Sequence, residues 1–124
     1  MVIKSKLQNL LENFTSSLPG VEGVVVASVD GLSIASVIST KIEEERTSAI
    51  SAAMFSLAER IAGELYRGHV EQILVEGEEG KGILVSCGTE AILLVLTKKE
   101  AKLGLLFLQV KRLTEELLPL LSEK

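Results

Sequence analysis

The sequence predicts an α/β fold of the α+β type, in which helices cover both faces of one five-stranded antiparallel sheet. Three segments repeat apolar residues with the period of an amphipathic helix, and five shorter segments are rich in the aliphatic residues typical of strands. Their order is helix, two strands, helix, three strands, helix. No linker, repeat or low-complexity tract interrupts this order, so residues 1–124 are expected to form a single domain.

The first predicted elements are a helix and a β-hairpin. Large apolar side chains recur at helical spacing over residues 3–18, and the following Pro and Gly end that helix. The strands predicted over residues 23–29 and 32–38 flank Asp30 and Gly31, a pair typical of a type I′ turn. The first strand carries Val on both of its sides, so both faces of the sheet are expected to be covered.

The second predicted helix, from Glu43 to Arg67, has two different long sides. One side carries a stripe of large apolar residues, which predicts that this side faces the core. The stripe consists of Ile50, Met54, Leu57, Ile61 and Leu65. Thr40 and Glu43 have the spacing of a capping box at the start of the helix, and Gly68 is the expected C′ residue at its end.

The opposite side of this helix carries small and aromatic residues where a solvated side would carry mostly charge. Small side chains let another helix approach closely, and aromatic ones supply large contact areas, so this side predicts a partner-binding surface. The alternatives are a helix packed on both sides within its own domain, or simply an alanine-rich helix. The predicted surface consists of Ser48, Ala52, Phe55, Ser56, Glu59, Ala62, Gly63 and Tyr66. We expect Phe55→Ala or Ala52→Arg to abolish client binding or dimerisation while leaving the fold largely intact.

The remaining predicted elements are three strands in a meander and a last helix. The strands cover residues 69–76, 82–87 and 91–97, and the helix keeps its apolar spacing over residues 103–121. In this layout the second helix covers one face of the sheet alone, and the other two helices share the opposite face. If the third strand lies at an edge, pairing with its own copy about a two-fold axis would join two sheets and bring the second helices together. This strand consists of His69, Val70, Glu71, Gln72, Ile73, Leu74, Val75 and Glu76.

Composition and charge exclude several classes of function. A formal net charge of -4 argues against binding to nucleic acid, which requires clustered Lys and Arg. One Cys and one His leave no multi-cysteine or imidazole metal site, and the lone Cys87 fits a reduced, cytoplasmic setting. The start of the chain lacks a signal-peptide core, and the apolar run at residues 91–96 is too short to span a bilayer. The 47% hydrophobic content favours self-association.

Four stretches share a characteristic pattern of turns and packing residues. They are residues 18–36 with their Pro-Gly and Asp-Gly turns, the alanine-rich residues 48–65, the strand at residues 91–96, and the Leu-Gly-Leu entry to the last helix at residues 103–105. In this pattern the chain resembles the Roadblock family, small α/β domains related to dynein light chains and to regulators of Ras-like GTPases. The resemblance covers nearly the whole chain and implies a profilin-like fold.

The resemblance also implies partners. Members of the family form homodimers or heterodimers through the third strand and the second helix, and commonly have a small GTPase as client. In single-domain prokaryotic members, the paired second helices form a platform for the switch regions of the GTPase, and some of these members activate GTP hydrolysis. The protein is therefore expected to be a homodimeric, cytoplasmic regulator of a small Ras-like GTPase. The alternatives are a non-catalytic dimeric scaffold or adaptor within a larger motor or signalling assembly, and a sensory domain with a small ligand.

No pattern in the sequence predicts an active site or a cofactor. Gly77, Gly80 and Gly82 lack the spacing of a phosphate-binding loop and precede no helix, so they predict a hairpin turn. His69 is expected to cap a helix or line an interface, and Cys87 to be a small buried residue. The arginines lie outside any predicted mobile loop, so stimulation of hydrolysis would come from ordering the switch segments of the GTPase. They are Arg46, Arg60, Arg67 and Arg112.

Overall fold

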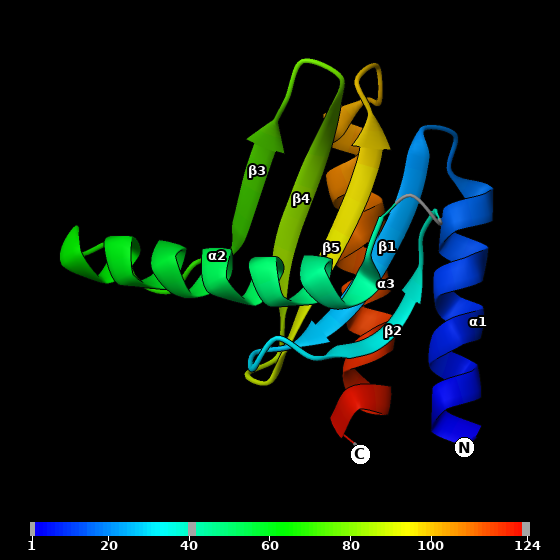
Figure 1. Ribbon diagram of the computed structural model, residues 1–124, viewed down its shortest axis with the longest axis horizontal. Helices are drawn as coiled ribbons and strands as arrows, with labels where there is room; N and C mark the ends of the chain where they lie inside the picture. The colour runs from blue at the N-terminus through cyan, green and yellow to red at the C-terminus, as the bar shows by residue number, and fades with distance from the viewer. Residues whose placement is uncertain (1, 40–41, 123–124) are drawn as a thin grey trace.

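The computed structural model describes residues 2–39 and 42–122 and has the predicted order of elements (Figure 1). The helices are α1 (Val2–Ser17), α2 (Glu44–Glu64) and α3 (Leu103–Ser122). The strands are β1 (Val21–Ser28), β2 (Ser33–Val37), β3 (Gln72–Glu76), β4 (Gly80–Cys87) and β5 (Ala91–Lys98). The predicted fold class, three helices with one five-stranded antiparallel sheet, is confirmed.

The five strands form one sheet in the order β2-β1-β5-β4-β3, and every neighbouring pair is antiparallel. The last three strands form the predicted meander, and β3 lies at an edge. At the centre, β1 pairs with β5, with Val24 opposite Val95. These two strands are buried along most of their length, as their uninterrupted aliphatic sequences predict.

Helices cover both faces of the sheet, and each face has its own core (Figure 1). α1 and α3 pack side by side on one face and form the larger core, in which Leu11, Val95 and Leu117 are fully buried. α2 crosses the other face alone, over a smaller core. The buried members of that core are Val25, Ala52, Phe55, Leu84, Ile92 and Leu94.

The turn between β1 and β2 differs from its prediction. The hairpin forms, but a type I′ turn is wrong because Asp30 does not have a positive φ. Instead the N–H of Gly31 donates to the carbonyl of Ser28 at 2.9 Å, and Gly31 alone takes a left-handed φ of 93°. A Cβ at Gly31 would lie 3.2 Å from the Cα of Ala49, so this turn also needs glycine for the close approach of α2.

The two ends of α2 also differ from the prediction. Its N-cap residue is Glu43, which makes no side-chain cap hydrogen bond, so the predicted capping box is wrong; Thr40 lies outside the described residues. The helix ends at Glu64, two residues before a left-handed Tyr66, rather than at Arg67 with Gly68 as its C′ residue. β3 accordingly begins at Gln72, and the first three residues of the predicted strand, at positions 69–71, belong to the connection.

Candidate protein-binding surface

The side of α2 that faces the sheet is the one predicted to bind a partner. Ser48 is fully buried, and Ala52 and Phe55 are 8% and 7% exposed against the smaller core. Ala62 is buried as well, and Glu59 is half-buried. The prediction that these side chains form a free surface of the protomer is therefore wrong. Because α2 lies close to the β1–β2 turn at Gly31, most of the side chains that it buries near this turn are small.

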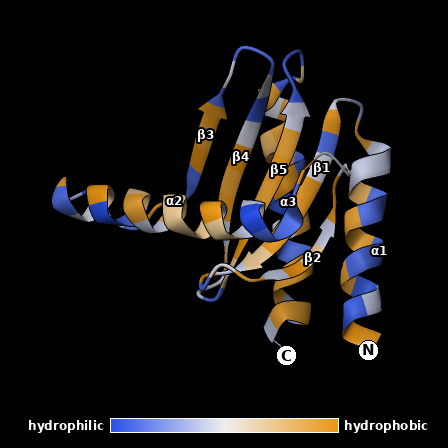
Figure 2. Cartoon of the chain, viewed as in Figure 1, coloured by the Kyte–Doolittle hydropathy of each residue, from blue (hydrophilic) through white to orange (hydrophobic). Residues whose placement is uncertain are grey.

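The stripe of large apolar residues on α2 is exposed, so its prediction as the core side is wrong. Met54 is half-buried, while the other four side chains are more than half exposed. The exposed fractions are 57% for Ile50, 65% for Leu57, 63% for Ile61 and 56% for Leu65. The second half of α2 projects beyond β3, where no strand lies beneath it, and it carries hydrophobic residues along this part (Figures 1 and 2). An exposed apolar stripe of this size is typical of a protein interface.

A third side of α2, called here the outer side, points away from both the sheet and the stripe. Its residues are exposed and mostly small, and a Cβ at Gly63 would meet no atom within 4 Å. Ser56 and Gly63 of the predicted partner-binding set lie here. The outer side consists of Arg46, Ala49, Ala53, Ser56, Arg60 and Gly63. This side was not recognised from the sequence, because the helix was divided into two sides only and Ser56 and Gly63 were assigned to the predicted partner-binding surface.

The edge strand β3 lies next to this helix and is itself largely exposed. Within residues 2–39 and 42–122 it pairs only with β4, so one row of its backbone donors and acceptors has no described strand beside it. Leu74 and Val75 are 39% and 44% exposed. Exposed apolar edge strands are templates for pairing with another chain.

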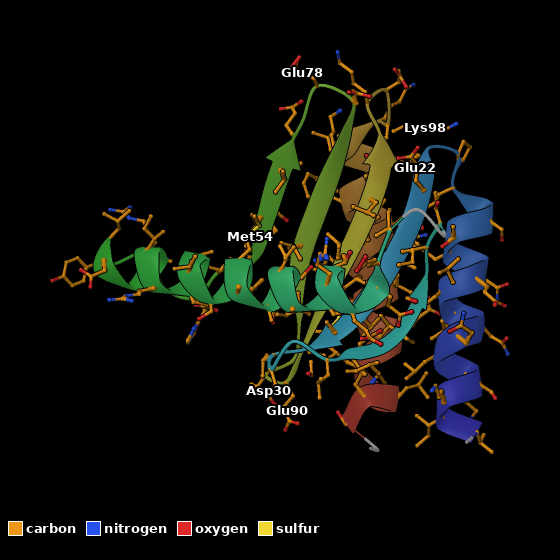
Figure 3. All side chains as sticks on the ribbon, viewed as in Figure 1. Glu22, Asp30, Met54, Glu78, Glu90 and Lys98 are labelled. Atoms are coloured by element: carbon orange, nitrogen blue, oxygen red, sulfur yellow. The ribbon has the colours of Figure 1, made fainter. Side chains whose placement is uncertain are left out.

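A groove separates α2 from the end of the sheet that carries the turn between β3 and β4. Its volume is about 480 Å³. Met54 lies on the side of α2 nearest this turn, and Glu22 marks the same end of the sheet (Figure 3). The floor is apolar because α2 covers only part of this face, and it consists mainly of Val75, Gly82, Leu84, Leu94 and Leu96. Periodicity alone could not predict the groove, which depends on where the helix crosses.

The tip of α2, residues 65–67, has an unusual backbone. The N–H of Tyr66 donates to the carbonyl of Gly63 at 3.1 Å, and the N–H of Arg67 donates to that of Ala62 at 2.8 Å, which together form a Schellman motif. The left-handed position of this motif usually holds Gly, yet here it holds Tyr66, with a φ of 57° and 93% exposure. A bulky residue in this conformation is strained and costs roughly 1 kcal/mol or more.

Metal clusters and reactive thiols are two features that could carry chemistry in this protein. Residues 2–39 and 42–122 contain no group of three His, Cys, Asp or Glu that could hold a metal ion. Cys87 is buried as predicted, and desolvation raises the pKa of its thiol to about 11 despite an opposing hydrogen bond from Thr114. A thiol with this pKa is unreactive at neutral pH. The predicted hairpin turn at the glycines is confirmed, with the N–H of Gly77 donating to the carbonyl of Gly80 at 2.8 Å.

We compared the sequence with models of known protein families. A model of the Roadblock/LC7 domain matches residues 7–97. The chain belongs to the Roadblock/LC7 family. Two uncharacterized proteins of Methanocaldococcus jannaschii are 41% and 40% identical to this Roadblock/LC7 protein over 98 residues, which are 79% of this chain and 85% of each relative. The family resemblance predicted from the sequence is thus confirmed.

Solved structures share the fold of this Roadblock/LC7 protein. A Roadblock/LC7 domain from Streptomyces avermitilis has a TM-score of 0.85 at 23% identity, covering 93% of this chain and 97% of that one. MglB of Myxococcus xanthus has a TM-score of 0.90 at 17% identity, covering 97% and 90%. A profilin of Acanthamoeba castellanii, with a TM-score of 0.66 at 17% identity over 91% and 97%, confirms the profilin-like description. Within the described residues, no helix is long and apolar enough to cross a membrane.

Proposed function

We propose that this protein is a homodimer that binds a small Ras-like GTPase across its paired α2 helices and regulates it. The observation that carries the proposal is the exposed apolar stripe of α2 beside the open edge of β3. Monomeric soluble domains rarely expose large contiguous apolar surfaces, and such surfaces mark sites of protein interaction. The family resemblance implies both a dimer through these two elements and a GTPase as client.

The geometry of β3 and α2 supports the proposed dimer. An antiparallel pair of β3 strands, related by a two-fold axis normal to the sheet, would satisfy the open backbone groups and make the sheet continuous. Because α2 projects past β3, the same rotation lays each α2 over the partner's sheet, antiparallel to the partner's α2 (Figure 1). The apolar stripes of the two helices then face each other, which buries side chains such as Leu57 and Ile61.

The outer sides of the two α2 helices remain in solvent in this dimer and form the platform for the client. Ala49, Ala53 and Gly63 permit close approach, while Arg46 and Arg60 supply positive charge along the helix. Both arginines lie on a regular helix, which holds them in place instead of letting them reach into another active site. Stimulation of GTP hydrolysis would therefore come from holding the switch segments of the GTPase in their competent arrangement.

The test is a binding assay with the immobilised protein and extract of the source organism, run in GDP and in a non-hydrolysable GTP analogue. A small GTPase retained mainly with the analogue is expected, since only differential affinity for the two forms can act on a switch. The GTPase is then purified, and its hydrolysis rate is measured with and without the protein. Retention of large assembly proteins alone, or equal binding of both nucleotide forms without a change in rate, would favour a scaffold instead.

A matched pair of glycine variants locates the client surface. Gly63→Arg places a bulky charge on the outer side of α2, and Gly104→Arg places the same change on α3; a Cβ at either position would meet no atom within 4 Å. Gly63→Arg is expected to weaken GTPase binding at least about tenfold, and Gly104→Arg to leave it unchanged. Equal behaviour of the two variants would contradict the placement of the client on the outer side.

A further inference from the structure

The tip of α2 is exposed in the protomer, and the groove is open to solvent. The two features lie on opposite sides of β3. The tip projects beyond β3, whereas the groove lies over the sheet, between α2 and the β3–β4 turn (Figures 1 and 3). We propose that Tyr66 at the tip of each α2 docks in the groove of a second copy of this chain and locks the dimer. This inference rests on the dimer of the proposed function and adds its locking residue.

The backbone of Tyr66 is the first argument. A left-handed conformation is strained for a bulky side chain, and a Gly in the same position would form the same helix end without that cost. The ring gains nothing within the protomer in return, because it is 93% exposed. Strained residues of this kind occur where their orientation serves binding.

The location and size of the groove are the second argument. Rotation about an axis beside β3 moves the projecting half of α2 from beyond the edge to a place over the partner's sheet, on the half that the partner's own α2 leaves uncovered. That half is the floor of the groove, next to Thr47 and Ile50 near the start of α2. Its volume of about 480 Å³ is within the range that holds a drug-sized molecule, so the side chains of Leu65 and Tyr66 fit it.

Charge complementarity is the third argument, and it favours a second copy over an unrelated protein. The N-cap Glu43 and the first two residues of α2, Glu44 and Glu45, precede Arg46 and leave this end of the helix negative. The tip, residues 65–67, carries Arg67 and no acidic residue, so it is net positive. Antiparallel pairing brings the positive tip of each helix to the negative start of the other, and it also aligns the two helix dipoles favourably.

Two variants of Tyr66 test the tip. Tyr66→Gly removes the ring and relieves the strained backbone, whereas Tyr66→Phe keeps the ring. The dimer dissociation constant is measured by sedimentation over a series of protein concentrations. Tyr66→Gly is expected to raise it at least about tenfold, and Tyr66→Phe to change it by no more than about twofold. In a monomeric background made with Leu57→Glu, Tyr66→Gly is expected to leave the unfolding midpoint unchanged or to raise it.

A variant of the groove tests the other half of the contact. A Cβ at Gly82 would meet Leu94, Leu96 and Val75 at 3.8 to 4.0 Å, which is ordinary contact distance, so the protomer accommodates Gly82→Ala, and Gly82→Val adds two further methyl groups at the floor of the groove. It is expected to weaken the dimer as Tyr66→Gly does, with Gly82→Ala as the milder variant if the valine reduces folding.

The outcomes separate this inference from the proposed function. A wild-type protein that is monomeric at every concentration overturns the dimer and the lock together. A dimeric wild type whose dissociation constant is unaffected by Tyr66→Gly overturns the lock alone and leaves the dimer standing. Loss of GTPase binding in Tyr66→Gly with an unchanged dimer also overturns it and assigns the tip to the client. A lowered unfolding midpoint in the monomeric background would show instead that Tyr66 acts within its own protomer.

Discussion

Glu59 and Val70 are joined across the connection between α2 and β3: Oε1 of Glu59 accepts the backbone N–H of Val70 at 3.3 Å. The same oxygen lies 3.5 Å from Nδ1 of His69, whose side chain is 99% exposed. This hydrogen bond explains why the strand predicted to begin at residue 69 begins at Gln72, since it takes the N–H of Val70 away from the sheet. It also fixes the direction in which the chain leaves the tip of α2.

Glu59→Ala is therefore expected to loosen this connection. Loss of a charge-assisted acceptor for a half-buried N–H should lower the free energy of unfolding by roughly 1 kcal/mol. Hydrogen exchange at the amide of Val70 should become faster, while exchange in β5 should stay unchanged. Glu64→Ala, at an exposed position of the same helix, is the control. Equal effects of the two substitutions would show that only helix charge matters.

Phe55 and Leu57 are expected to have opposite roles. Phe55 is 7% exposed on the sheet side of α2, so Phe55→Ala should destabilise the protomer by about 3 kcal/mol or more, which replaces the expectation from sequence that the fold would survive largely intact. Leu57 is 65% exposed, so Leu57→Ala should change protomer stability by less than about 0.5 kcal/mol. Denaturant unfolding at low protein concentration measures both. A larger loss for Leu57→Ala would mean that the stripe packs within the protomer.

Cys87 is expected to make the stability of the protein fall in alkaline solution. Burial raises the pKa of its thiol from 9.0 to about 11, so between these values the unfolded chain loses the proton while the folded chain keeps it. The contribution of this thiol to the free energy of unfolding is then complete below pH 9, and it declines as the pH rises toward 11. From pH 8 to pH 10, wild type should lose about 1 kcal/mol more than Cys87→Ala. Denaturant titrations at both pH values measure this difference, and parallel losses in the two proteins would show that the thiol does not contribute.

The sequence predicted the elements well because their signals are local. Apolar runs bounded by Pro, Gly and Asp-Gly turns mark β1, β2, β4 and β5, and their order leaves few ways to build one sheet. The buried and exposed sides of α2 were assigned the wrong way round from the sequence, because a periodic stripe of large aliphatic residues predicts a side that faces the core. The distance between helix and sheet decides otherwise, and it depends on Gly31 at the remote β1–β2 turn. The left-handed backbone of Tyr66 was not predictable either, because Gly68, two residues later, is the stronger local signal for a helix end.

The pairing of β1 with β5 determines when this protein can fold during synthesis. β1 is made early, but the strand that lies between it and β4 is the last one of the sheet to leave the ribosome. Until residues 91–98 emerge, the inner edges of both β1 and β4 lack the strand that pairs with them, and the apolar side chains of β1 have only α1, α2 and β2 to pack against. Contacts between strands so distant in sequence make folding slow. The nascent chain is therefore expected to depend on chaperones until β5 is complete.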